Sequence, residues 1–438
     1  MWSRAISCLL GCAALGAAVT ADPASPLVWE PAVEVASGRA ERGPWRQSES
    51  RFDYVDDPAV AVDAQGGVAI AWVDQARKAV LFQHFAPDGK ARLDQPVDVS
   101  RRPETFSWLP RISIAPDGQV AIAWQEIVFS GGSHGGEILV ASSRDGGRTF
   151  SHPANLSNSK AGDGKGRIDS ERWHNGSLDI AAGPDGAVYV AWTEYEGALW
   201  ISRRAGGGGS FSRPVRIAGS TAAPARGPSL AVGPGGVLHV AWTVGEDEGA
   251  DIHLATSTDG GASFGRAQRV APSRTYSDAP KLAVDPAGML HLVYAESAGG
   301  PFDRFHIRHT RSSDAGQSFE PSRDISAPLP AGSAGAGFPA LGIDSQGRLY
   351  VTWELYGQVR QPPRGLALSV SMDGGRRFTT PSVVPGSIDA AGGFNGSGQG
   401  LLMKKLAVNG AGAVAIANSS FRPGSHSRVW LMRGRLPP

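Results

Sequence analysis

The chain has 438 residues and a formal net charge of +1, with 41% hydrophobic and 19% charged residues. A near-neutral chain has no overall field that would attract nucleic acid or an acidic membrane surface, so neither is expected as a partner. The hydrophobic fraction is large enough for a sizeable core. The 58 glycines and 31 prolines favour many short strands joined by tight turns.

The N-terminus has the pattern of an export signal. Residues 1–4 form a short charged start, residues 5–19 form an apolar run, and small residues then precede Asp22. We therefore expect a signal peptide over residues 1–21 and a mature chain, residues 22–438, that is periplasmic or secreted. The apolar run is too short to span a bilayer and no later stretch is long enough, so no transmembrane segment is expected.

Both cysteines, Cys8 and Cys12, lie inside this segment. The mature chain would then have no disulfide, and its stability must come from its core. A second interpretation of the same residues is a bacterial lipobox at residues 9–12, which would make Cys12 the lipid-bearing N-terminus of a lipoprotein.

A two-strand pattern recurs along the rest of the chain. A short strand, in which apolar residues alternate with small or polar ones, is followed by an Asp/Gly turn and by a strand that usually ends in Trp. A third strand follows each pair and, except in the last copy, a fourth. The copies begin at Pro58, Pro110, Ser177, Pro228, Pro280, Pro339 and Lys404.

The last copy lacks a fourth strand after it. Residues 31–36, which precede the first copy, match the pattern of that missing strand. The expected fold is all-β: a seven-bladed β-propeller of four-stranded antiparallel blades, in which one terminal strand completes the last blade in a 3+1 arrangement. Such closure removes the open edges of the ring. Residues 22–438 would form this single domain.

Four copies carry the motif S-x-D-x-G-x-x-F between their third and fourth strands, at residues 143–150, 257–264, 312–319 and 371–378. The Asp carboxylate can accept backbone N–H groups across the turn, and the Gly takes a conformation closed to other residues. The Phe anchors the hairpin between sheets. A structural role is therefore expected for Asp145, Asp259, Asp314 and Asp373.

This motif is the Asp box, or bacterial neuraminidase repeat, and the chain resembles the sialidase superfamily over nearly all of its mature length. The resemblance implies a propeller whose site lies at the centre of one face, with the Asp boxes on the rim. Sialidases use an arginine triad for the substrate carboxylate, a Tyr nucleophile helped by Glu, and an Asp acid/base. Asp boxes also occur in glycoside hydrolases, polysaccharide lyases, assembly factors and sorting receptors.

The repeat predicts which residues meet around the channel. The loops that lead into the first strand of each blade and out of its second strand share one face. Asp57, Asp278 and Lys404 lie on this face together with the candidate residues named below. Charged residues at strand ends are also often solvated or paired structurally, and that interpretation remains beside the functional one. For ligand binding we single out Arg111, Arg172, Trp173, Glu194, Arg226, Lys281 and Glu354. For catalysis we single out Glu126, His174, Tyr276 and Glu296.

Three of these residues, Arg111, Arg172 and Arg226, could supply cations, because a guanidinium pairs with a carboxylate through two hydrogen bonds. Tyr276 and the serine after it resemble the sialidase Tyr-Ser, and Glu296 follows at the end of the next strand. Two features depart from the family: the Arg-Ile-Pro motif of sialidases is absent, and sialidases have six blades.

A long polar loop, residues 155–175, precedes the third copy and ends at the channel. Its His174 could act as a general base in a lyase-like site or be a structural hydrogen-bonding residue. Its Asp163, Asp169 and Glu171 could bind calcium, but EF-hand spacing is absent, so we expect no metal and no other cofactor.

Three functions remain open at this point. The chain could be a glycan-active enzyme, either a sialidase-like glycoside hydrolase or a polysaccharide lyase. It could instead bind glycans or anionic sugars without catalysis, or be an exported assembly or scaffold factor. An enzyme would place an acid/base pair and an arginine cluster in an open pocket, whereas a scaffold would expose an apolar patch. A glycan or anionic sugar is the expected ligand, and the oligomeric state is left open.

Overall fold

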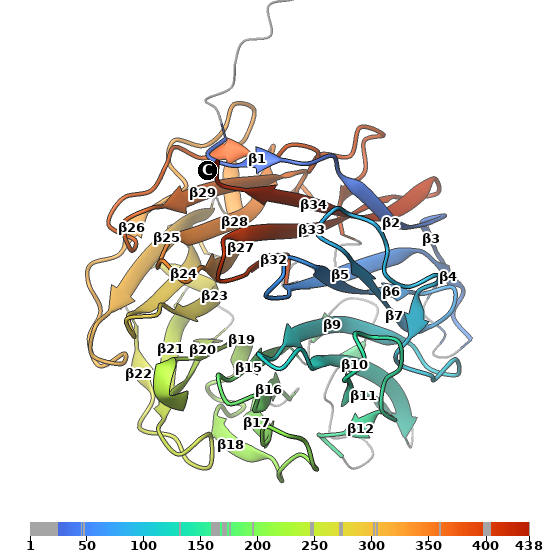
Figure 1. Ribbon diagram of the computed structural model, residues 1–438, viewed down its shortest axis with the longest axis horizontal. Coiled ribbons are helices and arrows are strands. Elements are labelled where there is room, and N and C mark those ends of the chain that lie inside the picture. Colours follow the sequence, from blue (N-terminus) through green and yellow to red (C-terminus); the bar gives the residue numbers. More distant parts are fainter. Residues whose placement is uncertain are drawn as a thin grey trace, which may run out of the picture.

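The computed structural model describes residues 25–437, apart from residues 45, 47–48, 131–132, 159–166, 169–172, 175–176, 195–196, 246–248, 271–274, 301–302, 304, 359–360 and 397–403. These residues form antiparallel sheets arranged around a central axis, with the first strand of each sheet nearest the axis (Figure 1). Six blades are four-stranded sheets, and the seventh is a six-stranded sheet. The predicted all-β, seven-bladed propeller is confirmed. The predicted signal peptide and Cys12 lie outside the described residues.

The blades follow the chain in order. Blade one consists of β5 (Val55–Val62), β6 (Val68–Asp74), β7 (Ala79–Phe85) and β8 (Val97–Asp98). Blade two consists of β9 (Ser107–Ile114), β10 (Val120–Ser130), β11 (Ser133–Ser143) and β12 (Ala154–Asn155). Blade three consists of β15 (Leu178–Ala182), β16 (Val188–Thr193), β17 (Leu199–Arg204) and β18 (Val215–Ala218). Blade four consists of β19 (Ala225–Val232), β20 (Leu238–Val244), β21 (Asp251–Ser257) and β22 (Gln268–Arg269). Blade five consists of β23 (Tyr276–Val284), β24 (Leu290–Ser297), β25 (Phe305–Ser312) and β26 (Arg323–Asp324). Blade six consists of β27 (Gly335–Ile343), β28 (Leu349–Tyr356), β29 (Leu366–Ser371) and β30 (Ser382–Val383). Outside these sheets lie the 3-10 turn η1 (Pro234–Gly236) and two short hairpins, β3 (Glu41–Arg42) with β4 (Phe52–Asp53) and β13 (Arg167–Ile168) with β14 (Trp173–His174).

The seventh blade joins the two ends of the chain, which lie side by side in Figure 1. Its outer strand, β2 (Val33–Gly38), pairs antiparallel with β34 (His426–Arg435), and the Glu34 carboxylate binds the Arg428 guanidinium across this pairing at 2.6 Å. The predicted 3+1 closure is therefore confirmed, although the closing strand lies two residues later than the predicted residues 31–36. The strands of this sheet are β32 (Leu406–Val408), β33 (Ala413–Arg422), β34 (His426–Arg435) and β2 (Val33–Gly38), extended at the inner edge by β31 (Phe394–Asn395) and at the outer edge by β1 (Val28–Trp29).

Each boundary between neighbouring blades has its own apolar core. The buried side chains form separate clusters, and each cluster combines residues of adjacent blades. Between blades five and six, for example, Val293 and Ile307 pack with Val351 and Trp353. Repeated burial of one sheet face against the next therefore holds the ring together. The aromatic residue near the end of the second strand packs against the preceding blade in six cases: Trp72, Trp124, Trp192, Trp242, Tyr294 and Trp353.

The turn between first and second strands depends on one polar side chain in most blades. Asp285 Oδ1 accepts the backbone N–H groups of Ala287 at 2.9 Å and Met289 at 2.8 Å. Two hydrogen bonds from the following backbone to one side-chain oxygen fix the turn. The same pair of bonds is made by the oxygens of Asp63, Asp344 and Asn409.

A β-bulge interrupts the first strand in five blades, one residue before a proline. The bulged residue has a positive φ even where it is not glycine: the value is 52° at Asp57 and 55° at Ala279. A left-handed residue with a Cβ costs about 1 kcal/mol, and a bulge changes the direction of the side chains beside it. The repeated bulge therefore sets how the start of each first strand faces the channel. The other bulged residues are Leu109, Gly227 and Phe338.

The Asp boxes lie on the loops between third and fourth strands and make the contacts that a structural role requires. Asp145 Oδ1 accepts the Ser143 hydroxyl at 2.7 Å and the Thr149 N–H at 3.0 Å. Hydrogen bonds from the Thr149 side chain and backbone lower the pKa of Asp145 to about 2. The corresponding bonds recur at Asp259, Asp314 and Asp373.

Each box also contacts the preceding blade. A Cβ added to Gly375 would lie 2.5 Å from His309 Cε1 of blade five, so only glycine fits there. Arg311 of the same blade donates to the Gly374 carbonyl at 2.7 Å. Arg203 and Gly260 form the equivalent bond between blades three and four at 2.7 Å. The Asp boxes therefore join neighbouring blades at the rim.

Candidate functional site

Five charged side chains surround the channel near its middle, and we call them the channel cluster. Four come from first strands and Lys404 lies two residues before one, so the ring brings together positions far apart in the sequence. Arg111 interacts with Asp57 and Asp179, and Lys281 with Asp179, Arg111 and Lys404. Two of the residues predicted to bind ligand, Arg111 and Lys281, therefore lie in one cluster. Its members are Asp57, Arg111, Asp179, Lys281 and Lys404.

Two members of the channel cluster are fixed by backbone groups. Lys404 extends from blade seven to blades two and three, where its Nζ donates to the carbonyls of Ile112 at 3.1 Å and Ile180 at 3.4 Å. Asp179 accepts the Leu230 N–H of the next blade at 2.9 Å. First strands have an unpaired edge along the channel, and these side chains satisfy part of it.

Lys281 differs from the other cations of the cluster. It is surrounded by protein but keeps part of its surface open to the channel. Its ammonium makes no hydrogen bond or ion pair with any residue that the structure describes. Burial, partly offset by Asp179, lowers the pKa of Lys281 to about 8. A cation without an acceptor in such a place is unfavourable, so the site is suited to an anion.

Asp57 is the buried carboxyl of the cluster that contacts blade two. It is 1% exposed, its Oδ2 accepts the Leu109 N–H at 3.2 Å, and its Oδ1 has no partner within the described part of the chain. Burial and the neighbouring Asp56 raise the pKa of Asp57 far above its usual range. With three cations and two carboxyls, the channel cluster has an excess of positive charge, which the raised pKa of Asp57 increases.

A second group lies between blades four and five and contains Arg226, Thr243, Tyr276 and Asp278. We call it the rim cluster because it lies at the rim of the channel, away from the outer rim that bears the Asp boxes. The Tyr276 hydroxyl donates to Asp278 Oδ2 at 2.8 Å and accepts from Arg226 Nη2 at 3.1 Å. Thr243 donates to Asp278 Oδ1 at 2.8 Å. The structure thus brings the predicted Arg226 and Tyr276 together. Burial, and then Asp278, raises the pKa of Tyr276, so this hydroxyl keeps its proton at neutral pH.

Glu296, predicted to assist Tyr276, lies on the other face of the same sheet. Glu296 is directly opposite Ser277 in the β23–β24 pairing, and cross-strand partners share a face. Tyr276 precedes Ser277 and so projects from the opposite face. Glu296 instead forms an ion pair with Arg308 at 3.3 Å. The carboxylate that contacts the tyrosine is Asp278.

Glu126 is fully buried. It accepts hydrogen bonds from Thr105, from Ser107 at 2.7 Å and from the Trp124 indole at 2.8 Å. Burial raises the pKa of Glu126 to about 7, although these donors oppose the shift. Because every contact is with its own blade, Glu126 does not join the rim cluster or the channel cluster.

The remaining predicted residues are placed as follows. Glu354 is fully buried and paired with Lys405. Glu194 lies in a turn in which its N–H donates to the Ala198 carbonyl at 2.8 Å. Arg172 lies outside the described residues, as do the proposed calcium ligands. The side chains of Trp173 and His174, in β14, also lie outside the described part.

Sequence reasoning missed Asp179 and Thr243. Asp179 occupies the repeat position held by Arg111, Lys281 and Lys405, where the other three blades have Ala or Ser. A charge at a position that is small in those three blades was the available signal. Thr243 gave no such signal, because threonine is common in strands.

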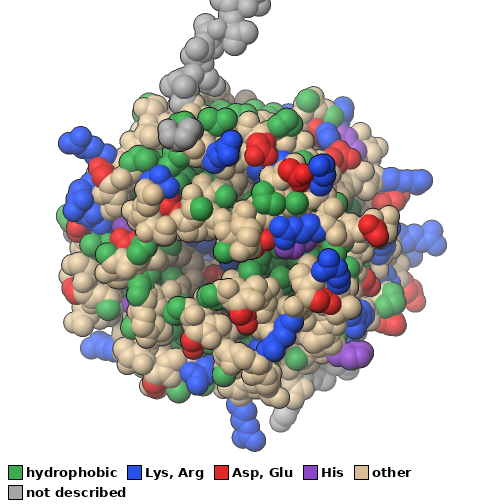
Figure 2. Space-filling model, viewed as in Figure 1, with side chains coloured by type: hydrophobic (Ala, Val, Ile, Leu, Met, Phe, Trp, Pro, Cys, Tyr) green, Lys and Arg blue, Asp and Glu red, His purple; other side chains and the backbone are tan. Residues whose placement is uncertain are grey.

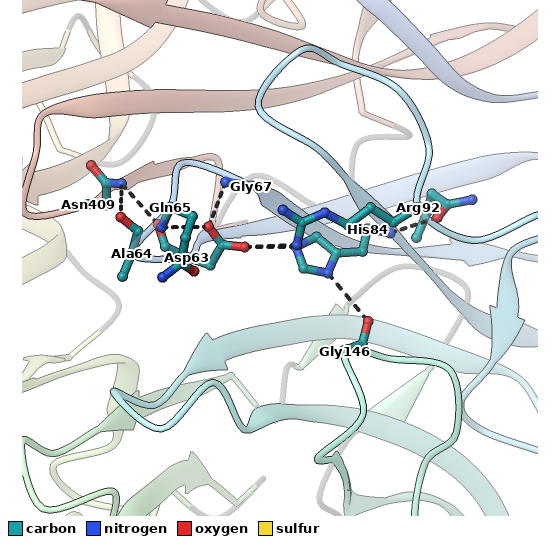
Figure 3. A network of polar contacts seen from close by, with 9 residues as sticks. Asp63, Ala64, Gln65, Gly67, His84, Arg92, Gly146 and Asn409 are labelled. Carbon is teal, nitrogen blue, oxygen red and sulfur yellow. Dashed lines mark hydrogen bonds and ion pairs between the residues drawn. The ribbon is translucent and has the colours of Figure 1, made fainter.

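A cavity of about 720 Å³ opens on the face opposite the predicted site. All seven blades line it through the turns between first and second strands, including Val62, Asp63, Val284 and Asp285. Figure 3 shows that Asp63 is directed into the protein: its carboxylate binds the backbone of Gln65 and Gly67, and His84 at 3.2 Å. The acidic side chains that line this cavity are therefore held by hydrogen bonds within the turns.

The surface and the metal-ligand pattern give no further site. Acidic and basic side chains are interspersed over the face shown in Figure 2, as a net charge of +1 suggests. Among the described residues, no group of three or more His, Cys, Asp or Glu side chains could hold a metal ion. The described part of the chain also contains no helix of the length and apolarity needed to cross a membrane.

No protein-family model and no curated protein matches this sequence, but solved structures do. An ulvan lyase of a polysaccharide lyase family, bound to a GlcA(1-4)Rha3S fragment, covers 91% of this chain and 95% of its own, with 12% identity and a TM-score of 0.53. The chain shares its fold with propellers that act on glycans.

Two further structures have lower scores. The α-L-arabinanase of Penicillium chrysogenum, complexed with arabinobiose, covers 74% of this chain and 92% of its own at 15% identity, with a TM-score of 0.47. A Hadza microbial sialidase covers 69% of this chain and 63% of its own at 14% identity, with a TM-score of 0.46. With scores and identities this low, neither structure bears on the activity, which is argued from the site.

Proposed function

We propose that this protein binds an anionic polysaccharide in its channel and cleaves it at the rim cluster. The observation that carries the proposal is Lys281, whose ammonium lies beside Arg111 and Lys404 with no acceptor among the described residues. A carboxylate or sulfate group of an acidic sugar would supply the missing negative charge. The ulvan lyase with the same fold was solved with a uronic acid and a sulfated sugar, which supports this ligand class.

A polymer suits the site better than a single sugar. Lys281 and the rim-cluster residues Tyr276 and Asp278 all belong to β23. At about 3.3 Å per residue along a strand, Tyr276 and Lys281 are separated by more than one sugar ring. Arg226 at the rim and Lys281 in the channel would then bind acidic groups of different sugars in one chain.

The rim cluster has the groups needed for elimination from a uronic acid. Arg226 would pair with the sugar carboxylate, Asp278 would accept the proton from C5, and Tyr276 would give its proton to the leaving glycosidic oxygen. The C4–O bond breaks and a C4=C5 double bond forms. Hydrolysis through a tyrosine nucleophile would require Asp278 to deprotonate Tyr276. Both reactions draw the proton from Tyr276, so its raised pKa favours neither. We place elimination ahead of the sialidase-like reaction that the sequence resemblance suggested because the ulvan lyase has the same fold.

A substrate screen of the purified protein tests this function. Uronic-acid polysaccharides, sialosides and neutral arabinan should be incubated with the enzyme. Elimination would produce an unsaturated uronate that absorbs ultraviolet light, whereas hydrolysis would produce reducing ends without that absorbance. Binding without product would support the non-catalytic propeller. Binding of arabinan alone would contradict the proposal.

Replacement of Lys281 tests the ligand class. Lys281→Met should weaken binding of an acidic polymer about tenfold or more, since a charged contact is lost. Lys90→Met is the matched control, because Lys90 is 85% exposed and pairs with Asp88 outside the channel. Equal loss of affinity in both variants would indicate nonspecific attraction to positive charge.

We also propose that residues 1–21 direct export, as the sequence pattern indicates. N-terminal sequencing of protein recovered from the periplasm or medium should begin at Asp22. A lipid-modified Cys12 in the membrane fraction would establish the lipoprotein alternative instead.

A further inference from the structure

Blades six and seven share a buried polar site beside the channel cluster, where Lys405 interacts with Asp57. Glu354 of β28, Lys405 before β32 and Asn418 of β33 are all at most 4% exposed. The Lys405 ammonium binds the Glu354 carboxylate and donates to Asn418 Oδ1 at 2.8 Å. An amine, a side-chain amide and a carboxylate therefore meet where water has little access.

Asn395 of β31 connects the carboxylate to the amide nitrogen. Its Nδ2 donates to Glu354 Oε2, and its Oδ1 accepts from Asn418 Nδ2 at 3.2 Å. Asn418 Nδ2 also donates to the Ser387 carbonyl at 3.0 Å. The orientation of the Asn418 amide is thus fixed on both sides, with its carbonyl toward Lys405.

We propose that Lys405 and Asn418 become joined by an amide bond. Glu354 takes one proton from the Lys405 ammonium and passes it to Asn418 Nδ2, while the amine lone pair forms a bond to Asn418 Cγ. Glu354 takes the second proton of Nζ as the Cγ–Nδ2 bond breaks. The products are a secondary amide, ammonia and a protonated Glu354, and no oxidant or cofactor is needed.

Two physical effects favour this reaction in the folded protein. Fixing amine and amide side by side gives an effective concentration far above that of free groups in solution. A buried ammonium and carboxylate also carry a large desolvation cost, and the reaction removes both charges. The bond would tie the first strand of blade seven to the second strand of the same blade, where the ring closes.

Mass spectrometry of the full chain tests the proposal directly. The intact protein should be lighter than its sequence by the mass of one ammonia, about 17 Da. Trypsin should fail to cut after Lys405, giving a peptide of residues 405–428 with the same deficit, because Arg422 precedes proline and is not cut either. Fragmentation should give no backbone ions from between Lys405 and Asn418.

Three variants complete the test. Lys405→Met and Glu354→Gln should each restore the full sequence mass, whereas Lys404→Met should keep the deficit because Lys404 binds backbone carbonyls and not Asn418. A wild-type protein of full mass that is cut after Lys405 would overturn the proposal and leave a buried ion pair. A deficit mapped to Asn409, which precedes glycine and can cyclise alone, would overturn it equally.

Discussion

Tyr276 is the side chain on which the proposed chemistry depends most. Tyr276→Phe removes the hydroxyl but keeps the ring, which packs against Phe305 at 5.8 Å. We expect product formation to fall about 10²–10⁴-fold, the range for loss of a general acid, with little change in polymer affinity. Turnover and equilibrium binding should be measured together. Glu296→Gln is the control, because Glu296 lies on the other face of blade five, and it should keep both. Unchanged turnover in Tyr276→Phe would rule out the rim cluster as the reacting centre.

Two buried histidines make the stability depend on pH. His291 Nδ1 lies 3.2 Å from His309 Nε2, and burial lowers both pKa values, that of His309 to about 3. In the unfolded chain both would titrate near their usual value of about 6.5, so the unfolded state binds more protons below that pH. Their contribution is complete above about pH 6.5 and is lost as the pH falls below that value, by up to ~1.4 kcal/mol per pH unit for each group. For His309 the loss continues toward pH 3.

Denaturant unfolding at pH 7 and pH 5 measures this loss. His309→Gln should flatten the difference between the two pH values, because it removes one of the titrating groups. His152→Gln is a suitable control, since His152 is exposed on the surface. The same pH difference in His309→Gln as in the wild type would show that other groups determine the acid sensitivity.

At the scale of the element, neighbouring glycines of one Asp box separate backbone strain from contact between blades. Gly374 and Gly375 both have positive φ, but an added Cβ at Gly374 meets nothing within 4 Å, whereas at Gly375 it meets His309 at 2.5 Å. Gly374→Ala should cost about 1 kcal/mol of unfolding free energy, and Gly375→Ala about 1–3 kcal/mol more. Denaturant unfolding checks this. Equal costs would mean that the box does not hold blade six against blade five.

Elements were easier to predict than the contacts between them. The repeat predicted each first strand and each Asp box, because alternation and turn residues are local signals. The partner of Tyr276 was predicted one strand away, at Glu296, whereas the contacting carboxylate is Asp278 on the same strand. Alternation alone would have placed Tyr276 and Asp278 on one face. The contact of Glu354 with Lys405 depends on how blade six meets blade seven, which no local pattern encodes.

For the whole molecule, the decisive feature is the pairing of β2 with β34. Deletion of residues 25–38 should leave the edge of blade seven unpaired and cause aggregation. A synthetic peptide of residues 25–38, added during refolding, should restore a soluble protein of normal melting temperature. Size-exclusion chromatography and thermal melting check both outcomes. A soluble deletion variant that melts like the full chain would show that closure contributes little.

The ring as a whole could be predicted because repetition multiplies a weak signal. A single strand pair at Pro58 would be ambiguous, but seven copies at similar spacing, with a matching strand at residues 31–36, fix the number of blades and the closure. The site could not be predicted as fully. Asp57 and Lys404 gain their environment from the ring, since each meets side chains of other blades across the channel.

Closure also distinguishes a complete molecule from a fragment. Glu34 and Arg428, which bind each other across the joined ends, are 394 residues apart in the sequence. During synthesis the strand that contains Glu34 is made long before its partner exists. A chain cut short near either end keeps one sheet edge unpaired, and such edges are what chaperones and proteases encounter in unfinished proteins. The pairing that stabilises the finished ring is therefore also the one whose absence leaves an unfinished chain prone to aggregation.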